Sequence, residues 1–182
     1  LYGVRPGTQA IVLAANDDAY GVALDLADAG VNIVAIADLR ERPEMGLLAT
    51  AVKEKGWRVE TGCAVSEAIA GDGGRSLRGA VLSRIDGKGV TSGAEQLNCD
   101  LICMSVGYAP VGQLPCHDGG QLRLDTASST FVLENLPEHG HAAGSVTGTH
   151  SLDAVLATGA HAGWRAARAA GFNAGDEPTI HD

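Results

Sequence analysis

The sequence is poor in aromatic residues and in positive charge, and it contains no long apolar run. Aromatic side chains make up 4% of the 182 residues, and 13 lysines and arginines stand against 22 aspartates and glutamates, for a net charge of -9. Because nucleic acids and anionic membranes attract basic surfaces, this charge argues against both as partners. No apolar run reaches the ~20 residues that a membrane-spanning helix needs. We therefore expect a cytoplasmic chain that binds neither.

The four cysteines and six histidines lack the spacing of redox, metal or nucleophile sites. No C-x-x-C pair occurs, which favours reduced, mostly buried thiols. Cys99 and Cys103 on one expected strand would share a face but stand ~13 Å apart, too far for a disulfide. His139 and His141, and the run 116–118, have no second ligand pair at zinc spacing. Without a G-x-S-x-G motif either, we expect no metal site and no catalytic residue.

The composition indicates a folded α/β chain. Hydrophobic residues make up 45% of the sequence, and 25 glycines accompany many alanines, a pattern that excludes disorder and favours helices packed closely on a sheet. The length suits one domain with a substantial core, or one domain plus part of another. The chain begins at Leu1 with neither Met nor a signal-peptide pattern, so we expect an internal segment of a longer protein.

Residues 10–38 have the order strand, turn, helix, strand that is typical of a dinucleotide-binding unit. The turn at 14–19, however, has no glycine where such binders have G-x-G-x-x-G. Asn16 places a side chain where the pyrophosphate would approach, and Asp17 and Asp18 would cap the helix while repelling a phosphate. Two interpretations stay open: a structural unit without a nucleotide, and an unusual nucleotide binder.

Charged residues follow the second strand of this unit. Asp38 stands near the ~20-residue offset at which a carboxylate would accept hydrogen bonds from an adenine ribose. Arg40 and Arg42 come next and could instead accommodate the 2'-phosphate of NADP. A charged loop after a strand explains the same residues. The pattern therefore prefers neither NAD nor NADP.

The first two thirds of the chain predict a Rossmann-like, three-layer domain with a parallel sheet and an antiparallel excursion. In chain order we expect a strand at 10–14, a helix ending at Gly30, a strand at 32–37, a helix from Pro43 to Lys55 with Leu47, Leu48, Ala51 and Val52 buried, and a strand at 57–60. The run 86–89 has hairpin chemistry between strands at 77–84 and 95–98. The apolar run 100–106 predicts a strand that is buried on both faces and returns to the first sheet.

From about Cys116 the pattern changes. Short extended pieces lead to a long helix from about 151 to 170, capped by Ser151. A stripe of small and apolar residues along one side of this helix predicts tight packing against a partner surface. The stripe consists of Leu152, Val155, Leu156, Gly159, Gly163 and Ala166. Little in the preceding sequence could supply a sheet for this helix, so we expect part of a second domain. The expected organisation is a linker at 1–8, an inserted Rossmann-like domain at 9–115, the C-terminal part of an outer dinucleotide-binding domain at 116–172, and a linker at 173–182.

Taken together, these segments resemble the flavoprotein disulfide reductase fold with two dinucleotide domains, one inserted in the other. The run 100–110 looks like its strand and G-x-x-P crossover, and 142–145 looks like its closing A-G-D segment with Ser145 in place of the Asp, which argues against ordinary FAD binding. More narrowly, the chain is similar to the alpha subunits of heterotetrameric sarcosine oxidases. That resemblance is carried, in order, by Gly3 to Gly7, the Asn16 to Tyr20 turn, Cys99 to Pro110 and the helix from Gly148 to Gly163.

The resemblance implies a dinucleotide-domain scaffold in the middle of a longer subunit. Its outer domain, with a glycine-rich half upstream of Leu1, would hold NAD, and a folate-binding domain would follow Asp182. The cofactor-binding candidates are Ala143, Gly144, Ser145, Gly148 and Thr149 in the outer site, and more weakly Asn16, Asp17, Asp38 and Gly107 in the inserted domain. With companion subunits that carry FAD or FMN, the complex would oxidise sarcosine to glycine, a one-carbon unit and hydrogen peroxide.

Other interpretations share the layout. Subunits of opine oxidase, hydrogen cyanide synthase and dye-linked proline dehydrogenase have the same arrangement of segments. A non-catalytic module that docks partner subunits, or a free-standing NAD-dependent reductase, would also fit the residues. On the first interpretation, the isolated 182 residues lack a complete active site and would be inactive.

Overall fold

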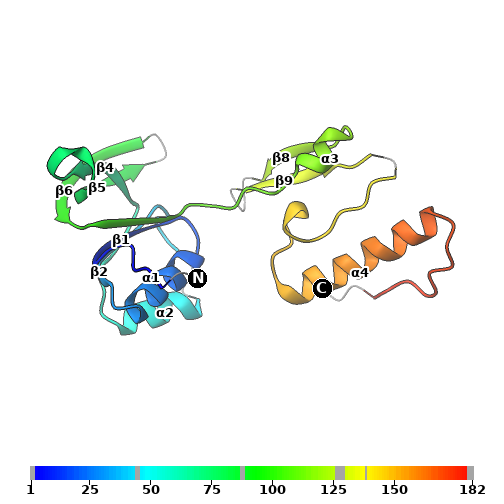
Figure 1. The fold of residues 1–182 in the computed structure, drawn as a ribbon, viewed down its shortest axis with the longest axis horizontal. Helices are drawn as coiled ribbons and strands as arrows, with labels where there is room; N and C mark the ends of the chain where they lie inside the picture. The colour runs from blue at the N-terminus through cyan, green and yellow to red at the C-terminus, as the bar shows by residue number, and fades with distance from the viewer. Residues whose placement is uncertain (1–2, 44–45, 87–88, 126–129, 138, 180–182) are drawn as a thin grey trace. The chain divides into compact units, whose positions relative to one another are not determined.

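The computed structural model describes residues 3–43, 46–86, 89–125, 130–137 and 139–179 (Figure 1). The chain divides into two compact units, the first ending at Val106 and the second beginning at Gly107. The elements of the first unit are β1 (Gln9–Ala14), α1 (Asp18–Asp28), β2 (Asn32–Asp38), α2 (Leu47–Glu54), β3 (Val59–Thr61), β4 (Cys63–Ala70), a 3-10 turn η1 (Asp72–Gly74), β5 (Leu77–Asp86), β6 (Gly89–Asn98) and β7 (Leu101–Ser105).

A parallel sheet in the order β3-β2-β1-β7 forms the middle layer of the first unit. Successive side chains of a strand point to opposite faces, so β1 supplies two cores. Ala10 and Val12 pack with helices α1 and α2, whereas Ile11 packs with the antiparallel sheet β4-β5-β6. The alanines of β1 and α1, fully buried at Ala14, Ala19 and Ala23, allow the close approach of helix and sheet. The predicted Rossmann-like α/β fold is confirmed.

The antiparallel excursion has three strands. β5 pairs with β6, as predicted, and the expected turn residues Gly87 and Lys88 lie outside the described residues. β4, which pairs with the other edge of β5, was not foreseen. Its sequence CAVSEAIA is rich in Ala, Ser and Glu, which have low strand propensity, and much of it stays exposed. Long-range pairing therefore decides its conformation.

The carboxylate of Asp100 fixes the start of β1 beside β7. It accepts hydrogen bonds from the backbone N–H groups of Thr8 (2.8 Å) and Gln9 (2.7 Å) and from the Thr8 hydroxyl (2.6 Å). These bonds hold the pKa of the Asp100 carboxyl below its usual value. A Cβ at Gly7 would lie 2.7 Å from the same carboxylate, which explains the glycine there.

Three predictions about the first unit are wrong in part. β7 is an edge strand, not a strand buried on both faces, and Met104 is 69% exposed. Because β7 begins only at Leu101, Cys99 packs on the antiparallel-sheet side and Cys103 on the helix side, so they do not share a face. All four cysteines are free. In α2 the buried residues are Ala49 and Val52, whereas Leu47, two positions from Ala49 and hence on the opposite side, is 91% exposed.

The second unit contains α3 (Gln113–His117), the antiparallel strands β8 (Gln121–Asp125) and β9 (Thr130–Asn135), a 3-10 turn η2 (Gly144–Thr147) and α4 (Leu152–Ala169). The hydroxyl of Ser151 accepts a hydrogen bond from the Ala154 N–H (3.4 Å), which confirms the predicted cap. Val155 faces Gly144, but Leu152 and Leu156 of the predicted stripe are 71% and 63% exposed. Within the described unit, this part of the stripe has no packing surface.

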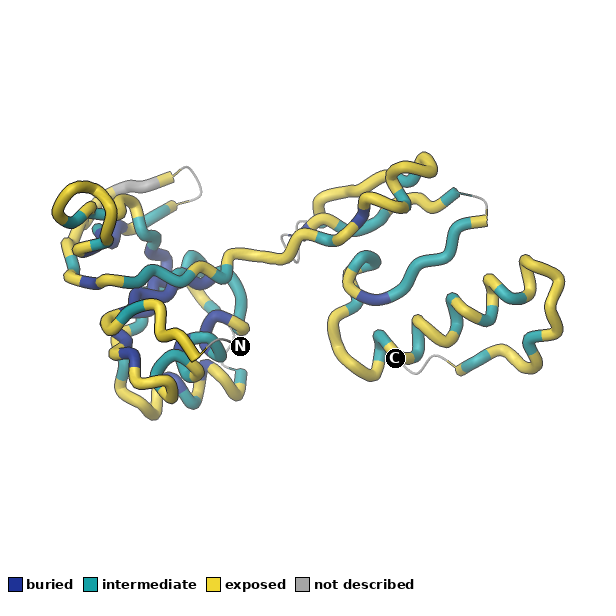
Figure 2. Tube along the Cα trace, viewed as in Figure 1, coloured by how far each residue is buried: buried dark blue, intermediate teal, exposed yellow. Residues whose placement is uncertain are grey.

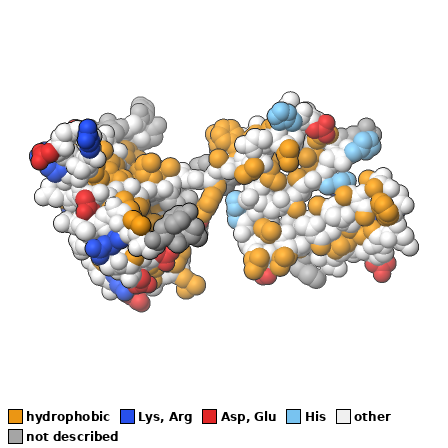
Figure 3. Space-filling model, in the orientation of Figure 1, with side chains coloured by type: hydrophobic (Ala, Val, Ile, Leu, Met, Phe, Trp, Pro, Cys, Tyr) orange, Lys and Arg blue, Asp and Glu red, His pale blue; other side chains and the backbone are white. Residues whose placement is uncertain are grey.

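Burial differs between the two units. Every buried hydrophobic side chain among the described residues belongs to the first unit, and Figure 2 shows these residues along β1, β2 and the helices. On the face drawn in Figure 3, apolar side chains are widespread on the surface of the second unit. The described helices include none that is long and apolar enough to cross a membrane.

Replacing Val52 by Ala should lower the free energy of unfolding by about 2 kcal/mol, because its fully buried methyl groups leave a cavity. Leu47→Ala, on the same helix, should change it by less than about 0.5 kcal/mol. Urea unfolding in a Trp164→Phe background, followed by the fluorescence of Trp57, measures both. Equal losses for the two variants would contradict the observed face of α2.

Candidate functional site

The turn after β1 is tied to β7. The Ala15 N–H donates to the Ser105 carbonyl (2.9 Å), and the Ser105 hydroxyl donates to Oδ1 of Asn16 (2.9 Å). Asn16 is therefore oriented by the neighbouring strand, in a turn where a nucleotide-binding unit has glycines.

Asp17 does not cap α1 with its side chain, contrary to the expectation from sequence. Its backbone is helical (φ -73°, ψ -20°), whereas a capping side chain needs an extended backbone to reach the first N–H groups. Its Oδ1 instead accepts a hydrogen bond from Nη1 of Arg40 (2.9 Å), so that it forms an ion pair with the segment after β2. The Asp17 carboxylate therefore makes a tertiary contact and does not cap the helix.

Asp38, at the end of β2, is fully buried and receives four hydrogen bonds. The Tyr20 hydroxyl donates to Oδ2 (2.6 Å), and the guanidinium of Arg40 donates through Nε to Oδ1 (3.0 Å) and through Nη2 to Oδ2 (2.9 Å). The backbone N–H of Arg40 donates to Oδ1 as well (2.9 Å). The Arg40 guanidinium also lies 5.9 Å from the centroid of the Tyr20 ring. Such a bidentate arginine–carboxylate pair is strong and geometrically specific.

These contacts determine the charges of the cluster. Burial alone would raise the pKa of the Asp38 carboxyl, but the hydrogen bonds from Arg40 and Tyr20 outweigh it and hold the pKa below its usual value. Burial and the neighbouring Asp38 raise the pKa of the Tyr20 hydroxyl well above its ordinary range. Hydrogen bonds to Asp38 likewise raise the pKa of Arg40. At neutral pH Asp38 is therefore a carboxylate paired with the Arg40 guanidinium, and Tyr20 is a neutral phenol.

The inserted turn does not fit a dinucleotide phosphate. Asp38, the candidate for the ribose, has both oxygens engaged within the protein, and Arg40, the candidate for a 2'-phosphate, is held by Asp38 and Asp17. Asp17 also places negative charge at the turn. Gly107, the remaining candidate, opens the second unit with φ 136°.

The sequence did not reveal Tyr20 as the partner of Asp38. A signal was present: Tyr20 lies on the small-residue face of α1, between Ala19 and Ala23, and a buried tyrosine needs a hydrogen-bond partner for its hydroxyl. The pairing itself depends on how α1 crosses β2. Among the described residues, no three His, Cys, Asp or Glu side chains come together as a metal site.

The outer-site candidates meet in one tight turn of the second unit. The carbonyl of Gly144 accepts hydrogen bonds from the Thr147 hydroxyl (2.8 Å) and the Thr149 N–H (3.2 Å), and the Gly148 N–H donates to the Ser145 carbonyl (3.1 Å). Gly144 and Gly148 have φ of 80° and 82°, in the left-handed region that favours glycine. The turn leads directly into α4.

Sequence comparison places the chain among known proteins. It is 33% identical over 171 residues to the sarcosine oxidase subunit alpha of Corynebacterium sp. strain P-1, and 32% identical over 171 residues to that of strain U-96; each match covers 94% of this chain. The subunit alpha of Rhizobium meliloti strain 1021 is 28% identical over 159 residues, or 87% of the chain. The chain is a relative of the sarcosine oxidase alpha subunits. It spans only 15–17% of the length of these relatives.

Solved structures share the fold of the chain. The thioredoxin reductase of T. acidophilum superposes with a TM-score of 0.64 at 18% identity, over 88% of this chain and 50% of that one. The thioredoxin reductase of Lactococcus lactis gives 0.59 at 20% identity, over 89% and 51%. At these identities the likeness concerns the fold alone. No protein-family model matches the chain.

Replacing Arg40 by Ala should destabilise the first unit by about 2–3 kcal/mol, because it leaves the buried Asp38 carboxylate without its counter-charge. Arg42 lies two residues further along the chain, and its side chain is exposed. Arg42→Ala removes an equal charge and should cost less than about 0.5 kcal/mol. Urea denaturation of the two variants measures the difference. A loss in Arg42→Ala as large as in Arg40→Ala would refute a specific role for the cluster.

The stability of the chain should depend on pH through Asp38. Its pKa in the folded protein lies below that in the unfolded chain, about 3.9. Its contribution is therefore complete above that value and is lost as the pH falls through the folded-state pKa. Asp38→Asn should be less stable than the natural sequence at pH 7, with the gap closing below about pH 4. Thermal unfolding of both proteins from pH 7 to pH 3 tests this, and a constant gap would count against it.

Proposed function

We propose that this chain is the dinucleotide-domain scaffold of an amine-oxidising oxidoreductase subunit similar to sarcosine oxidase alpha. The similarity to three such subunits over 87–94% of the chain carries the proposal. In the complete enzyme, sarcosine would be oxidised to glycine, a one-carbon unit and hydrogen peroxide with the help of companion subunits. A bound flavin would supply the hydride acceptor for that oxidation. The chain itself contributes structure and part of a nucleotide site.

We propose an inserted domain at 9–115 and part of an outer domain at 116–172. The two compact units, which divide between Val106 and Gly107, differ in burial as this organisation would require. The first unit has apolar clusters on both faces of its sheet. In the second unit, by contrast, Leu152 and Leu156 of α4 are largely exposed, as in a helix whose sheet is supplied by other residues. The remainder of the outer domain would cover these side chains.

We assign NAD to the outer turn rather than to the inserted one. The residues that would hold it are Ala143, Gly144, Ser145, Gly148 and Thr149. The left-handed glycines Gly144 and Gly148 allow a backbone approach that side chains would block, and Ser145 brings no negative charge toward a phosphate. The inserted turn offers the opposite, with Asp17 charged and Asn16 engaged with Ser105. The inserted domain therefore has a structural role and holds no nucleotide.

A second candidate function is docking of companion subunits without any nucleotide. The exposed apolar side chains of the second unit favour it, including Leu152, Leu156 and Phe172, each more than 60% exposed. The two functions differ in whether the complete subunit binds NAD. An amine substrate other than sarcosine, as in opine oxidase, hydrogen cyanide synthase or dye-linked proline dehydrogenase, is compatible with either.

In the complete subunit, Gly144→Ala should weaken NAD binding at least about tenfold, because a Cβ at φ 80° strains the turn. Asn16→Ala, in the inserted turn, should leave NAD affinity unchanged. Isothermal titration with NAD measures both, and thermal unfolding verifies that the variants fold. The reverse pattern would place the nucleotide in the inserted domain, and a complete subunit that binds no NAD would favour the docking function.

The isolated 182 residues should not oxidise NADH with a dye acceptor, whereas turnover would indicate a free-standing reductase.

A further inference from the structure

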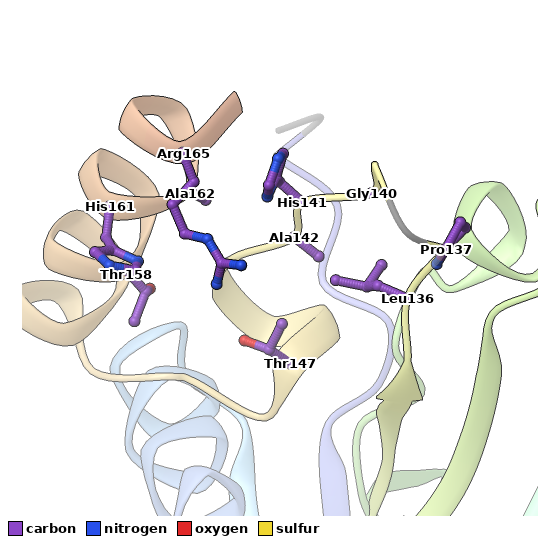
Figure 4. A pocket seen from close by; sticks show the side chains of 10 residues that line it. All are labelled: Leu136, Pro137, Gly140, His141, Ala142, Thr147, Thr158, His161, Ala162 and Arg165. Carbon is purple, nitrogen blue, oxygen red and sulfur yellow. The ribbon is translucent and has the colours of Figure 1, made fainter. Parts of the chain in front are cut away.

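Two cavities differ in what surrounds them. The cavity of about 510 Å³ shown in Figure 4 lies in the second unit, next to the turn η2 already proposed to hold NAD. Another cavity, of about 220 Å³, lies in the first unit between β3 and the antiparallel sheet. Buried Cys63 and Leu82 line this second cavity together with four charged side chains, Arg58, Glu60, Arg84 and Glu95.

The four charged side chains form a continuous series of ion pairs. The guanidinium of Arg58, directly before β3, donates to both carboxylate oxygens of Glu95 on β6 (2.9 Å and 2.6 Å) and through Nε to Glu60 (3.0 Å). Nη2 of Arg84, on β5, donates to the other oxygen of Glu60 (3.3 Å), and its Nη1 donates to the Thr61 carbonyl (2.9 Å). This ion-pair chain joins the edge of the parallel sheet to two strands of the antiparallel sheet.

The ion-pair chain is both strong in geometry and open to salt. Isolated surface ion pairs contribute little to stability, but bidentate arginine–carboxylate contacts and networks of several charges contribute more. Here Arg58 and Glu95 make a bidentate contact, and hydrogen bonds from Arg58 hold the pKa of the Glu95 carboxyl below its usual value. The side chains are 27% exposed at Glu60 and 58% exposed at Arg84, so dissolved ions can screen the pairs.

The apolar packing behind the ion-pair chain consists largely of small side chains. The cluster between the two sheets contains Ile11, Ala35, Ala37, Cys63, Ala80, Leu82 and Cys99. Small side chains bury little apolar area, so this packing stabilises the contact less than larger residues would. Cys63 and Cys99 are both buried in this cluster, but only Cys63 is among the residues that line the cavity beneath the ion-pair chain.

We propose that the ion-pair chain is a salt-sensitive latch that holds the antiparallel sheet against β3 and controls solvent access to Cys63. When the pairs are screened or broken, β5 and β6 separate from β3 at this cavity while the rest of the first unit stays packed. Such local opening requires less free energy than global unfolding. The latch lies within the first unit and does not depend on NAD binding or on the proposed oxidase activity.

Alkylation by iodoacetamide tests the latch, with mass spectrometry of the Cys63 and Cys99 peptides of the 182-residue chain as the readout. The reagent is uncharged, so salt does not alter its electrostatic attraction to the protein. The ratio of the Cys63 rate to the Cys99 rate should rise at least about threefold between about 0.1 M and about 1 M sodium chloride, because the Debye length falls from about 10 Å to about 3 Å.

Two substitutions break the same bidentate contact from opposite sides. Arg58→Gln and Glu95→Gln should each raise the rate ratio about fivefold at low salt and abolish its dependence on salt. They change the local charge in opposite directions, so a direct effect on ionisation of the Cys63 thiol would shift the two rates oppositely. Glu67→Gln is the matched control: this residue is exposed on β4 and outside the cavity lining, and its substitution should leave the ratio unchanged.

Three outcomes would overturn the latch. Parallel acceleration of Cys63 and Cys99 would mean that the whole core opens, opposite responses of Arg58→Gln and Glu95→Gln would mean an effect on the thiol alone, and an unchanged ratio would mean that the ion-pair chain holds nothing closed. Circular dichroism verifies that each variant folds. Rapid alkylation of the exposed Cys116 in every sample verifies the reagent.

Discussion

The carboxylate of Asp38 is the constraint around which the first unit is organised. It carries a negative charge to a position with no solvent exposure, where an unpaired charge would be strongly unfavourable. Arg40 and Tyr20 satisfy it from the loop after β2 and from α1, and Arg40 extends the pairing to Asp17 at the start of that helix. One buried charge thus joins a strand end, a helix and the turn between β1 and α1.

These contacts change the functional interpretation of residues 10–38, the segment with the pattern of a dinucleotide-binding unit. In a dinucleotide-binding unit, the end of the second strand and the first turn face the ligand. Here the same positions are occupied by ion pairs and hydrogen bonds internal to the protein, and the helix begins beside a carboxylate rather than a phosphate. The nucleotide site is instead proposed in the second unit, at the turn that contains the left-handed glycines Gly144 and Gly148. Ligand chemistry is therefore proposed for that unit, while the first provides the scaffold.

The sequence was most informative where local pattern and tertiary packing agree. The small and apolar periodicities of β1, α1 and β2, the hairpin chemistry of the run 86–89 and the cap at Ser151 each predicted an element that the structure contains. It was least informative where burial depends on neighbours distant in the chain. Leu47 has the apolar character of a core residue yet points away from the sheet, and β4 has weak strand propensity yet pairs along β5. The division at 115–116 and the nucleotide-binding residues stay predictions.

By itself, the sequence determined the order of the elements, the loss of the glycine fingerprint and the relationship to sarcosine oxidase alpha subunits, because these depend on residue types at short spacings. Only the tertiary structure decided what the charged residues do. Asp17 could cap a helix or pair with an arginine, and Asp38 could bind a ribose or a tyrosine. Which of these occurs depends on distances between residues up to 23 positions apart, and the packing of α1 against β2 fixes those distances.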